Sequence, residues 1–427
     1  MKVLIVGGGG REHAIALKIK ENPEVTALYA APGNGGIAQI ATCLPFKATD
    51  VDGIVRWAAE NKVDFVIVAP DDPLCLGMVD ALAEQGIPAF GPRKNAAIIE
   101  GSKVFSKNLM KKYGIPTAAY ETFDDYDEAV KYLQTADMPI VVKADGLALG
   151  KGVLICPDRE NAVEAVASMM KEAKFGASGA RVVIEEFLTG PEVSVLAFTD
   201  GKTVKPMVSS MDHKRALDHD EGLNTGGMGT IAPNPCYTPE LARRCMDEIF
   251  LPTIAAMNAE GRTFTGCLYF GLMMTPKGPK VIEYNCRFGD PETQVVLPLL
   301  KSDLLTIMRA TVDGTLADTP VEFASGAACC VVLASGGYPV SYKSGYSISG
   351  LDEAGKTATV FHAGTKLVDG QIVTAGGRVL GVTATADTLE AAIDKAYQAA
   401  DKITFTDMHM RRDIGQRALA SRKESHS

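Results

Sequence analysis

The stretch VLIVGGGGREHAIALKI, residues 3–19, begins with four apolar residues, continues with four glycines and ends in an amphipathic run. This order predicts a buried β-strand, a glycine turn and an α-helix, as at the start of a dinucleotide-binding unit. Apolar strands and amphipathic helices alternate up to about residue 100, and residues 73–86 are expected to form one helix of this series. The alternation predicts a parallel α/β sheet covered by helices on both faces.

The glycine run does not match the dinucleotide fingerprint, which needs a small residue at its sixth position. In the two possible registers that position is Glu12 or His13, and both side chains are large. The next strand also ends without the acidic residue that would hold a ribose hydroxyl. Bare amides at a helix N-terminus bind anions, so we expect Gly9, Gly10 and Arg11 to face a ligand phosphate. A purely structural turn is the alternative.

The composition excludes several classes of protein. A chain of 427 residues is too long for one compact core, which predicts two or three domains. The net charge of −9 argues against a general nucleic-acid-binding protein, and no apolar run reaches the ~18 residues of a membrane span. Nine scattered cysteines without a C-x-x-C pair indicate reduced thiols. Since no signal-peptide pattern precedes the first strand, we expect a cytoplasmic protein with no nucleic-acid or membrane partner.

The rest of the chain divides into two further units. The second begins near Gly101, and its stretch 205–236 is rich in charge and glycine, with little periodicity. The third begins near residue 321 and has short strands at hairpin spacing, followed by an amphipathic helix over about 388–403. This last pattern is typical of a small α+β unit.

The stretch VVKADGLALGKGVLI places Lys143 at the end of an apolar strand, with a glycine-rich loop after it. Gly146, Gly150, Lys151 and Gly152 suit a flap whose amides and lysine close over phosphates. The spacing is not that of a P-loop, because three residues separate the first two glycines and no Ser or Thr follows the lysine. A protein kinase has its glycine loop before the strand lysine, which is the opposite order. An ordinary glycine-rich hairpin is the alternative.

The stretch KVIEYNCRF combines a carboxylate, an amide and a guanidinium. The strand period of two puts Glu283, Asn285 and Arg287 on one face, together with the apolar Val281. Neighbouring carboxylate and amide oxygens suit Mg²⁺, which shares its ligands with substrate phosphates. Arg287 could bind a transferring phosphoryl group through two hydrogen bonds, and Asp290 follows in the next turn. A solvated strand face is the alternative.

Taken in order, these motifs resemble the ATP-grasp ligases, and among them the glycinamide ribonucleotide synthetase family. The resemblance covers the whole chain and is carried by GGGGREHA, GSKVFSK, KADGLALGKGV, IEEFLTGPEVSV, DHKRALDHDEGLNTGGMG and VIEYNCRFGDPETQ. It implies three domains: an N-terminal, Rossmann-like pre-ATP-grasp α/β domain, an ATP-grasp domain and a small C-terminal α+β domain. The implied limits are 1–101, 102–320 with a lid subdomain at about 122–192, and 321–427.

The resemblance also implies a set of site residues. The residues implied to bind ATP are Lys103, Lys143, Gly150, Lys151, Gly152, Glu185, Glu186, Phe187, Leu188 and Glu192. Those implied to bind the other substrates are Gly9, Gly10, Arg11, Asp212, His213, Lys214, Asn224, Thr225, Gly226, Gly227, Arg287 and Asp290. Catalytic roles are implied for Arg287, Lys143 and Lys151, and metal ligation for Glu283 and Asn285. The strand before these two ligands reads YFGLMMT and offers no further acidic ligand.

The implied reaction joins glycine to 5-phosphoribosylamine in purine biosynthesis. ATP is cleaved to ADP and phosphate, Mg²⁺ or Mn²⁺ assists, and glycyl phosphate is the intermediate. The implied protein acts on small molecules as a monomer or weak homodimer. A related ligase that forms carboxyphosphate or formyl phosphate, an NAD(P)-dependent dehydrogenase and a non-catalytic nucleotide sensor are the alternatives. For His213, the alternative to a substrate contact is a loop histidine exposed to water.

Overall fold

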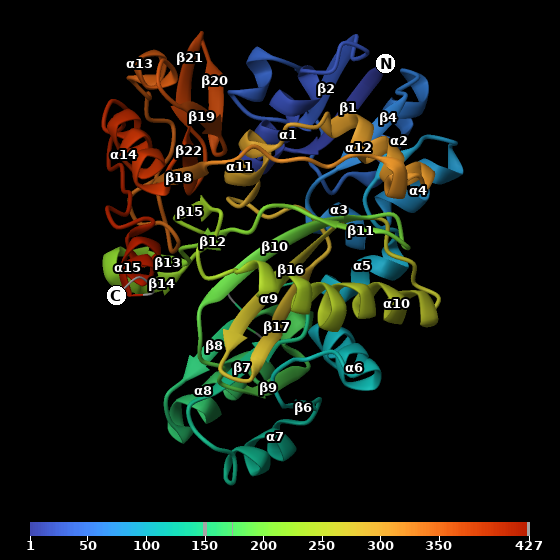
Figure 1. The fold of residues 1–427 in the computed structure, drawn as a ribbon, viewed down its shortest axis with the longest axis vertical. Coiled ribbons are helices and arrows are strands. Elements are labelled where there is room, and N and C mark those ends of the chain that lie inside the picture. Colours follow the sequence, from blue (N-terminus) through green and yellow to red (C-terminus); the bar gives the residue numbers. More distant parts are fainter. Residues whose placement is uncertain (148–151, 173, 425–427) are drawn as a thin grey trace.

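The computed structural model describes residues 1–147, 152–172 and 174–424. Its N-terminal unit contains a parallel sheet of order β3-β2-β1-β4-β5 with helices on both faces (Figure 1). The predicted parallel α/β unit is therefore confirmed. Its elements are β1 (Lys2–Gly7), α1 (Gly10–Lys20), β2 (Ala27–Pro32), η1 (Ile37–Gln39), β3 (Thr42–Cys43), α2 (Val51–Glu60), β4 (Phe65–Val68), α3 (Asp71–Cys75), α4 (Met78–Glu84), β5 (Ala89–Phe90) and α5 (Lys94–Gly101).

One helix of this unit differs from the prediction. Residues 73–86 were expected to form a single helix, but α3 and α4 are separate helices that meet at Gly77. Gly77 has φ +89°, a left-handed backbone conformation that glycine adopts easily. This conformation separates the end of α3 from the start of α4. The apolar periodicity continues across this break, which is why the sequence pattern did not predict it.

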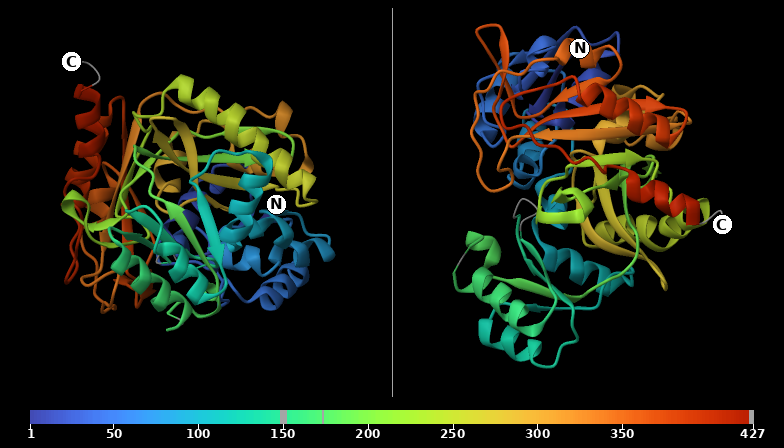
Figure 2. Two further views of the ribbon diagram at one scale, coloured as in Figure 1. Left: turned by 90° about the horizontal axis from the view of Figure 1, so that it is seen from below. Right: turned by 90° about the vertical axis from the view of Figure 1, so that its left-hand side faces the viewer.

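A lid of four antiparallel strands follows helix α6 (Lys103–Tyr113), in the order β6-β9-β7-β8. Helices α7 and α8 pack together, and α8 packs on the strands of this sheet. The lid has a hydrophobic core made only of its own residues, and it projects from the rest of the molecule (Figure 2). Its elements are β6 (Tyr120–Phe123), α7 (Tyr126–Leu133), β7 (Ile140–Ala144), β8 (Val153–Cys156), α8 (Arg159–Met170), η2 (Gly176–Gly179) and β9 (Val182–Glu186).

A second four-stranded sheet, of order β11-β10-β16-β17, lies between the lid and the N-terminal unit (Figure 1). Its strands share buried hydrophobic clusters with β1 and β4, since Leu4 and Phe270 belong to one cluster and Ile5 and Phe198 to another. These two units therefore pack as one body. The elements are β10 (Glu192–Thr199), β11 (Val204–Pro206), α9 (Pro239–Cys245), the π-helix η4 (Met246–Phe250), α10 (Leu251–Ala259), β16 (Gly266–Thr275), β17 (Gly278–Asn285), α11 (Thr293–Val296), η5 (Leu297–Leu299), α12 (Leu304–Asp313) and η6 (Leu316–Asp318).

The C-terminal unit is built on a five-stranded sheet of order β12-β15-β18-β22-β19, on which α14 packs. Two of these strands, β12 and β15, come from the stretch 205–236, which showed little periodicity because its strands are only a few residues long. The elements are β12 (Met211–Asp212), β13 (Arg215–Leu217), η3 (Asp218–Asp220), β14 (Glu221–Asn224), β15 (Gly229–Ala232), β18 (Ala327–Ala334), α13 (Leu351–Gly355), β19 (Thr359–His362), β20 (Thr365–Val368), β21 (Gln371–Thr374), β22 (Arg378–Ala386), α14 (Leu389–Ala400) and α15 (Gln416–Glu424).

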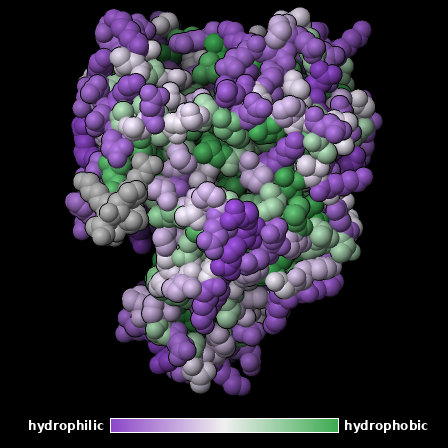
Figure 3. All heavy atoms as spheres, viewed as in Figure 1, coloured by the Kyte–Doolittle hydropathy of each residue, from purple (hydrophilic) through white to green (hydrophobic). Residues whose placement is uncertain are grey.

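Hydrophilic residues cover much of the face shown in Figure 3, and the lid extends below the larger body of the molecule. All nine cysteines are free thiols, as expected. Among the described residues, no helix is long and apolar enough to span a membrane.

Candidate active site

The end of β17 carries the carboxylate and the amide predicted as metal ligands. The pairing of β17 with β16 shifts between Val281 and Glu283, so that Ile282 is an extra residue in a β-bulge. Glu283 and Asn285 lie on a half-exposed face, as predicted, whereas Val281 is fully buried. The prediction that Val281 shares their face is wrong, because the bulge changes the phase of the strand.

A buried ion-pair cluster lies next to this bulge. Lys143 Nζ donates to the carbonyl oxygen of Ile282 at 3.2 Å and forms an ion pair with Glu185. The other carboxylate oxygen of Glu185 lies 2.6 Å from Lys107 Nζ. Burial alone would raise the pKa of Glu185, but Lys143 and Lys107 hold it below its usual value. The cluster joins α6, β7 and β9. Sequence reasoning missed Lys107, although it is one helical turn after Lys103.

Lys103 begins α6 and points toward the glycine loop. Its Nζ donates to the carbonyl oxygen of Gly146 at 2.9 Å. Burial and the neighbouring charge of Lys143 lower the pKa of Lys103, against the attraction of Glu283. The two lysines predicted to bind phosphate therefore lie close together, and both are near the predicted metal ligands.

The glycine loop is described only at its two ends. The carbonyl oxygen of Gly152 accepts a hydrogen bond from the Ala144 N–H at 2.8 Å, which pairs the start of β8 with the end of β7. The predicted ATP-binding residues Gly150 and Lys151 lie outside the described residues.

The remaining residues predicted to bind ATP follow Glu185 along β9 and the next turn. Glu186 is exposed, and its Oε1 lies 2.9 Å from Lys280 Nζ. Phe187 is exposed and Leu188 half-buried, while Glu192 is exposed at the first position of β10. These side chains are accessible to a ligand.

Arg287 lies just beyond the end of β17. Its Nη2 donates to Glu100 Oε1 at 3.0 Å and to Asn285 Oδ1 at 3.1 Å. Its Nε is buried and has no hydrogen-bond partner among the described residues. The guanidinium is thus fixed beside Asn285 by Glu100, and one donor is unused.

The sequence pattern predicts free backbone amides at the N-terminus of α1, but two of these amides have partners within the chain. The N–H of Gly9 donates to Glu12 Oε2 at 2.7 Å, and the N–H of Arg11 donates to Asp290 Oδ2 at 3.2 Å. The Arg11 side chain contacts Glu12 and the carbonyl oxygen of Phe288. Carboxylates of the chain itself therefore occupy two of the amides that the sequence pattern offered to a phosphate.

A cavity of about 350 Å³ lies beside this helix N-terminus. Its wall combines the opening glycines with residues from the C-terminal unit, which include Gly364, Thr365 and Arg378. Arg378 Nη1 donates to the carbonyl oxygen of Asp290 at 2.8 Å. Arg378 also helps to hold the pKa of Asp290 below its usual value, against the effect of burial. Sequence reasoning missed Thr365 and Arg378, because no local motif connects them with the first glycines.

The loop 212–229 connects this cavity with the metal-ligand face. Lys214 Nζ lies 3.9 Å from Asp212 Oδ2 and 3.8 Å from Glu283 Oε1. The Thr225 N–H and hydroxyl both donate to the carbonyl oxygen of Lys214 at 2.8 Å. The Gly227 N–H in turn donates to the Thr225 hydroxyl at 2.9 Å. The loop therefore brings Asp212, Lys214 and the 224–227 turn together.

His213, in contrast, faces the interior. It is 2% exposed, so the alternative of a water-exposed histidine is wrong. Its Nδ1 lies 3.1 Å from the carbonyl oxygen of Gly229, and its Nε2 accepts from the Gly415 N–H at 3.1 Å. Burial and the nearby charge of Arg411 lower the pKa of His213 to about 4. Both ring nitrogens of this neutral imidazole are bonded to backbone, so the observed contacts of His213 are structural.

The oxygen donors at the end of β17 fit a hard divalent cation. Glu283 has a side chain that is 34% exposed, and Lys214, Lys143 and Lys103 hold its pKa below its usual value despite burial. Among the described residues, no group of three or more His, Cys, Asp or Glu side chains could hold a metal ion. Two protein oxygens suit Mg²⁺, which takes its other ligands from phosphates and water.

Models of one protein family match the N-terminal, middle and C-terminal parts of the chain. The family model described as the phosphoribosylglycinamide synthetase N domain matches residues 1–100. The models of the ATP-grasp (A) domain and the C domain of the same synthetase match residues 101–293 and 328–417. The chain belongs to the phosphoribosylglycinamide synthetase family. Its α/β, ATP-grasp and α+β parts are those of this family, as expected from the motifs.

Individual members of the phosphoribosylglycinamide synthetase family are similar over their full length. The phosphoribosylamine–glycine ligase of Halalkalibacterium halodurans is 49% identical, covering 100% of this chain and 99% of that protein. The enzyme of the same name from Caldanaerobacter subterraneus is 48% identical, covering 97% and 99%. The crystal structure of the Thermotoga maritima phosphoribosylamine–glycine ligase has a TM-score of 0.86 at 35% identity, covering 97% of this chain and 100% of that one. The biotin carboxylase of Campylobacter jejuni shares only the fold, with a TM-score of 0.75 at 15% identity.

Proposed function

We propose that this chain is an ATP-dependent carbon–nitrogen ligase that joins glycine to 5-phosphoribosylamine in purine biosynthesis. The products are glycinamide ribonucleotide, ADP and phosphate. The observation that carries this proposal is the full-length similarity to phosphoribosylamine–glycine ligases, at 49% identity over 100% of the chain. The same reaction is supported by the contacts of Lys103 and Lys143 near the end of β17, and by the distance of 3.8 Å between Lys214 Nζ of the loop 212–229 and Glu283 Oε1.

The reaction takes two steps and needs no side-chain nucleophile. The glycine carboxylate attacks the γ-phosphorus of ATP, forming glycyl phosphate and releasing ADP. The amino group of phosphoribosylamine then attacks the acyl carbon, loses a proton and displaces phosphate, which forms the amide. The protein's contribution is to align the reactants and neutralise charge.

ATP would lie between the lid and the sheet that contains β17. Lys103 and Lys143 would contact its phosphates, while Glu185, held ionised by its two lysine partners, would meet the amino edge of adenine. The segment Glu186, Phe187 and Leu188 would line the base, and the exposed carboxylate of Glu192 would accept from the ribose hydroxyls. Gly150, Lys151 and Gly152 would close over the phosphates.

Glu283 and Asn285 would hold Mg²⁺ or Mn²⁺ together with the phosphates. When bound, this cation would neutralise negative charge on the phosphates during phosphoryl transfer. Arg287 would contact the transferring group through its guanidinium. The Glu100 carboxylate fixes the orientation of the guanidinium for this contact.

Phosphoribosylamine would occupy the cavity of about 350 Å³ beside α1. The backbone of Gly10 and the Arg378 guanidinium would face its phosphate. Gly9 and Arg11, whose N–H groups donate to Glu12 and Asp290, would hold the turn in shape beside it. Asp290 would contact the sugar. Asp212, Lys214 and the turn from Asn224 through Thr225 and Gly226 to Gly227 would complete the glycine site, and His213 would hold this loop from behind.

We take 1–101, 102–320 and 321–427 as the domain limits, although β12 and β15 place part of the middle domain in the C-terminal sheet. The chain would act on small-molecule substrates as a monomer or weak homodimer, without a nucleic-acid or membrane partner, and the cytoplasm is its proposed location.

The decisive experiment measures phosphate release from ATP with Mg²⁺ and glycine, with and without phosphoribosylamine. Release should depend on both glycine and phosphoribosylamine, and the amide product should appear in equal amount. Replacing glycine with bicarbonate or formate tests the related carboxyphosphate- and formyl-phosphate-forming reactions. Turnover that ignores phosphoribosylamine, or that prefers either replacement, would overturn the proposal.

A further inference from the structure

A segment near the C-terminus, residues 409–417, contacts the back of the loop 212–229. At its centre Arg411 has a side chain only 1% exposed. Its Nε and Nη2 donate to the two carboxylate oxygens of Asp413, each at 2.8 Å. Its Nη1 donates to the carbonyl oxygen of Arg215 and to Asp220 Oδ1, each at 3.1 Å. One buried guanidinium therefore connects the segment with strand β13 and with η3, the tip of the β13–β14 hairpin.

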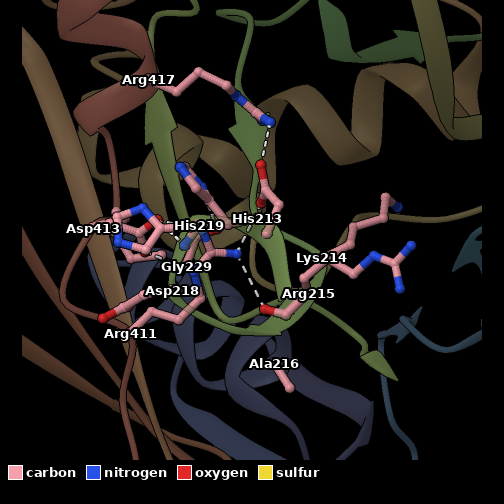
Figure 4. Close-up of polar contacts among 12 residues, drawn as sticks. His213, Lys214, Arg215, Ala216, Asp218, His219, Gly229, Arg411, Asp413 and Arg417 are labelled. Carbon is pink, nitrogen blue, oxygen red and sulfur yellow. Dashed lines mark hydrogen bonds and ion pairs between the residues drawn. The ribbon is translucent and has the colours of Figure 1, made fainter. Parts of the chain in front are cut away.

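Other residues of the segment 409–417 also contact the hairpin, through backbone and side-chain hydrogen bonds (Figure 4). Asp413 Oδ2 accepts from the His219 N–H at 2.9 Å, and the Arg412 N–H donates to Asp218 Oδ1 at 2.7 Å. Arg417 Nη1 donates to Asp220 Oδ2 at 2.7 Å. Each residue of the hairpin tip from 218 to 220 is thus held by at least one contact from the C-terminal segment.

The hairpin tip needs such support because its backbone is strained. His219 and Asp220 have φ values of 61° and 58°, so two consecutive non-glycine residues adopt the left-handed conformation. This conformation costs on the order of 1 kcal/mol or more per residue unless the surroundings stabilise it. Here the His219 N–H and the Asp220 carboxylate are both bonded to the C-terminal segment.

The part of the loop 212–229 that lies away from the hairpin tip carries the candidate substrate residues Asp212 and Lys214. The ladders β12–β15 and β13–β14 belong to separate sheets, but backbone hydrogen bonds join them. Between the pair Asp212 and Thr230 and the pair Arg215 and Asn224, the Met228 N–H donates to the His213 carbonyl oxygen and the Thr225 N–H to the Lys214 carbonyl oxygen. In Figure 4 the Lys214 side chain extends away from Asp413, and its Nζ lies 3.8 Å from Glu283 Oε1. The hairpin and the candidate substrate residues are therefore connected by hydrogen bonds of the backbone.

We propose that Arg411 is a positioning residue for the substrate loop, acting from the C-terminal segment without touching substrate. Through Asp413 and Asp220 it fixes the left-handed tip, and through the carbonyl of Arg215 it fixes the strand that begins next to Lys214. This inference rests on the proposed function, because it assigns the loop to glycine and phosphoribosylamine. It predicts that weakening the Arg411 contacts affects these two substrates and leaves ATP binding unchanged.

The test compares Arg411→Lys with Arg412→Lys in the full-length chain. Lysine keeps the charge at 411 but cannot reproduce the forked contact with Asp413. Arg412 is the matched control, because its side chain is half-exposed and pairs with Asp401 rather than with the loop. We expect Arg411→Lys to raise the KM for phosphoribosylamine and glycine roughly tenfold or more. The dissociation constant of a non-hydrolysable ATP analogue should not change in Arg411→Lys. In Arg412→Lys, neither this constant nor the two KM values should change.

Hydrogen exchange provides a second measurement that does not depend on turnover. The amides of Thr225 and Met228 bond within the loop, to the carbonyl oxygens of Lys214 and His213. They should exchange faster in Arg411→Lys, while amides in β10 and β16 should not. Faster exchange in every element, or unchanged KM values and loop exchange, would overturn the proposal.

The remaining outcomes also have a defined meaning. If Arg411→Lys does not fold, Arg417→Gln decides, because Arg417 is half-exposed and removing it loosens Asp220 alone. It should raise the same two KM values by a smaller factor, and unchanged values would overturn the proposal. A parent enzyme that binds the ATP analogue but shows no activity with glycine and phosphoribosylamine would instead contradict the proposed function.

Discussion

At the scale of single residues, the four opening glycines are explained by the chain around them. A Cβ on Gly8 would clash with the carbonyl oxygen of Gly33, and one on Gly10 would clash with the Gln294 amide. Gly7 has φ +120°, which side chains other than glycine rarely adopt. Neighbouring segments therefore require these glycines even without a dinucleotide, and the failed fingerprint and the observed packing agree.

Glu283 is the single residue on which turnover should depend most. Replacing it with alanine removes a carboxylate whose pKa is held low by three lysines, and with it one of two candidate metal ligands. We expect Glu283→Ala to lower kcat roughly 100-fold or more in the phosphate-release assay. Glu353→Ala is the control, since that carboxylate is exposed and forms an ion pair with Lys356 on the surface. A kcat within a few-fold of the parent would show that the metal-ligand assignment is wrong.

At the scale of elements, the alternation in β17 predicted that Glu283 and Asn285 share a face, but not the bulge at Ile282. A bulge leaves no trace in this pattern, because Val281 and Ile282 are both apolar and either phase of the strand looks plausible. The Ile282 carbonyl oxygen in this bulge accepts a hydrogen bond from Lys143 Nζ. The bulge therefore helps to position a lysine that is predicted to bind phosphate. The short strands in 205–236 escaped prediction because two to four residues show no period.

The junction of α6, β7 and β9 should depend on the Glu185 carboxylate. Glu185→Gln leaves Lys107 and Lys143 buried without a counter-charge, which should cost about 3–5 kcal/mol of unfolding free energy. Denaturant unfolding measures this loss, and the affinity for ATP should fall as well. The double variant Glu185→Gln, Lys107→Met should recover part of the stability, because it removes one unpaired charge. If it is no more stable than Glu185→Gln, the buried pair is not the cause.

At the scale of the whole molecule, buried histidines join distant parts of the chain. The His362 N–H, at the end of β19, donates to His13 Nδ1 on α1 at 2.8 Å, and His213 joins the substrate loop to Gly415. Local sequence patterns could not predict these contacts, since their partners are far apart in the chain. The same holds for Arg378 and the cavity beside the first glycines. Patterns within one stretch were easier to interpret: the opening glycines lie at the junction of β1 and α1, and Glu283 and Asn285 lie on β17, although the helix expected over 73–86 is broken at Gly77.

These histidines predict a loss of stability in mild acid. Burial lowers the pKa of His13 to about 3, and those of His213 and His362 to about 4. The unfolded chain binds protons at the ordinary pKa of 6.5, so between these values it carries more protons than the folded chain. Stability should therefore fall as the pH drops from about 6.5 to 4, by about 3 kcal/mol for each histidine.

Denaturant unfolding at several pH values between these limits measures the effect. His362→Asn should reduce the slope of stability against pH relative to the parent, because it removes one buried histidine with a lowered pKa. A slope equal to that of the parent would show that the buried pair of His13 and His362 is not responsible.

The C-terminal sheet is assembled from two distant stretches, and this has a consequence for synthesis on the ribosome. Strand β15 ends at Ala232, but its neighbour β18 begins only at Ala327, and β22 at Arg378. A nascent chain therefore exposes an open strand edge and an unsupported hairpin until its last segments emerge. Open edges invite pairing with other chains, so this topology predicts a risk of aggregation during translation.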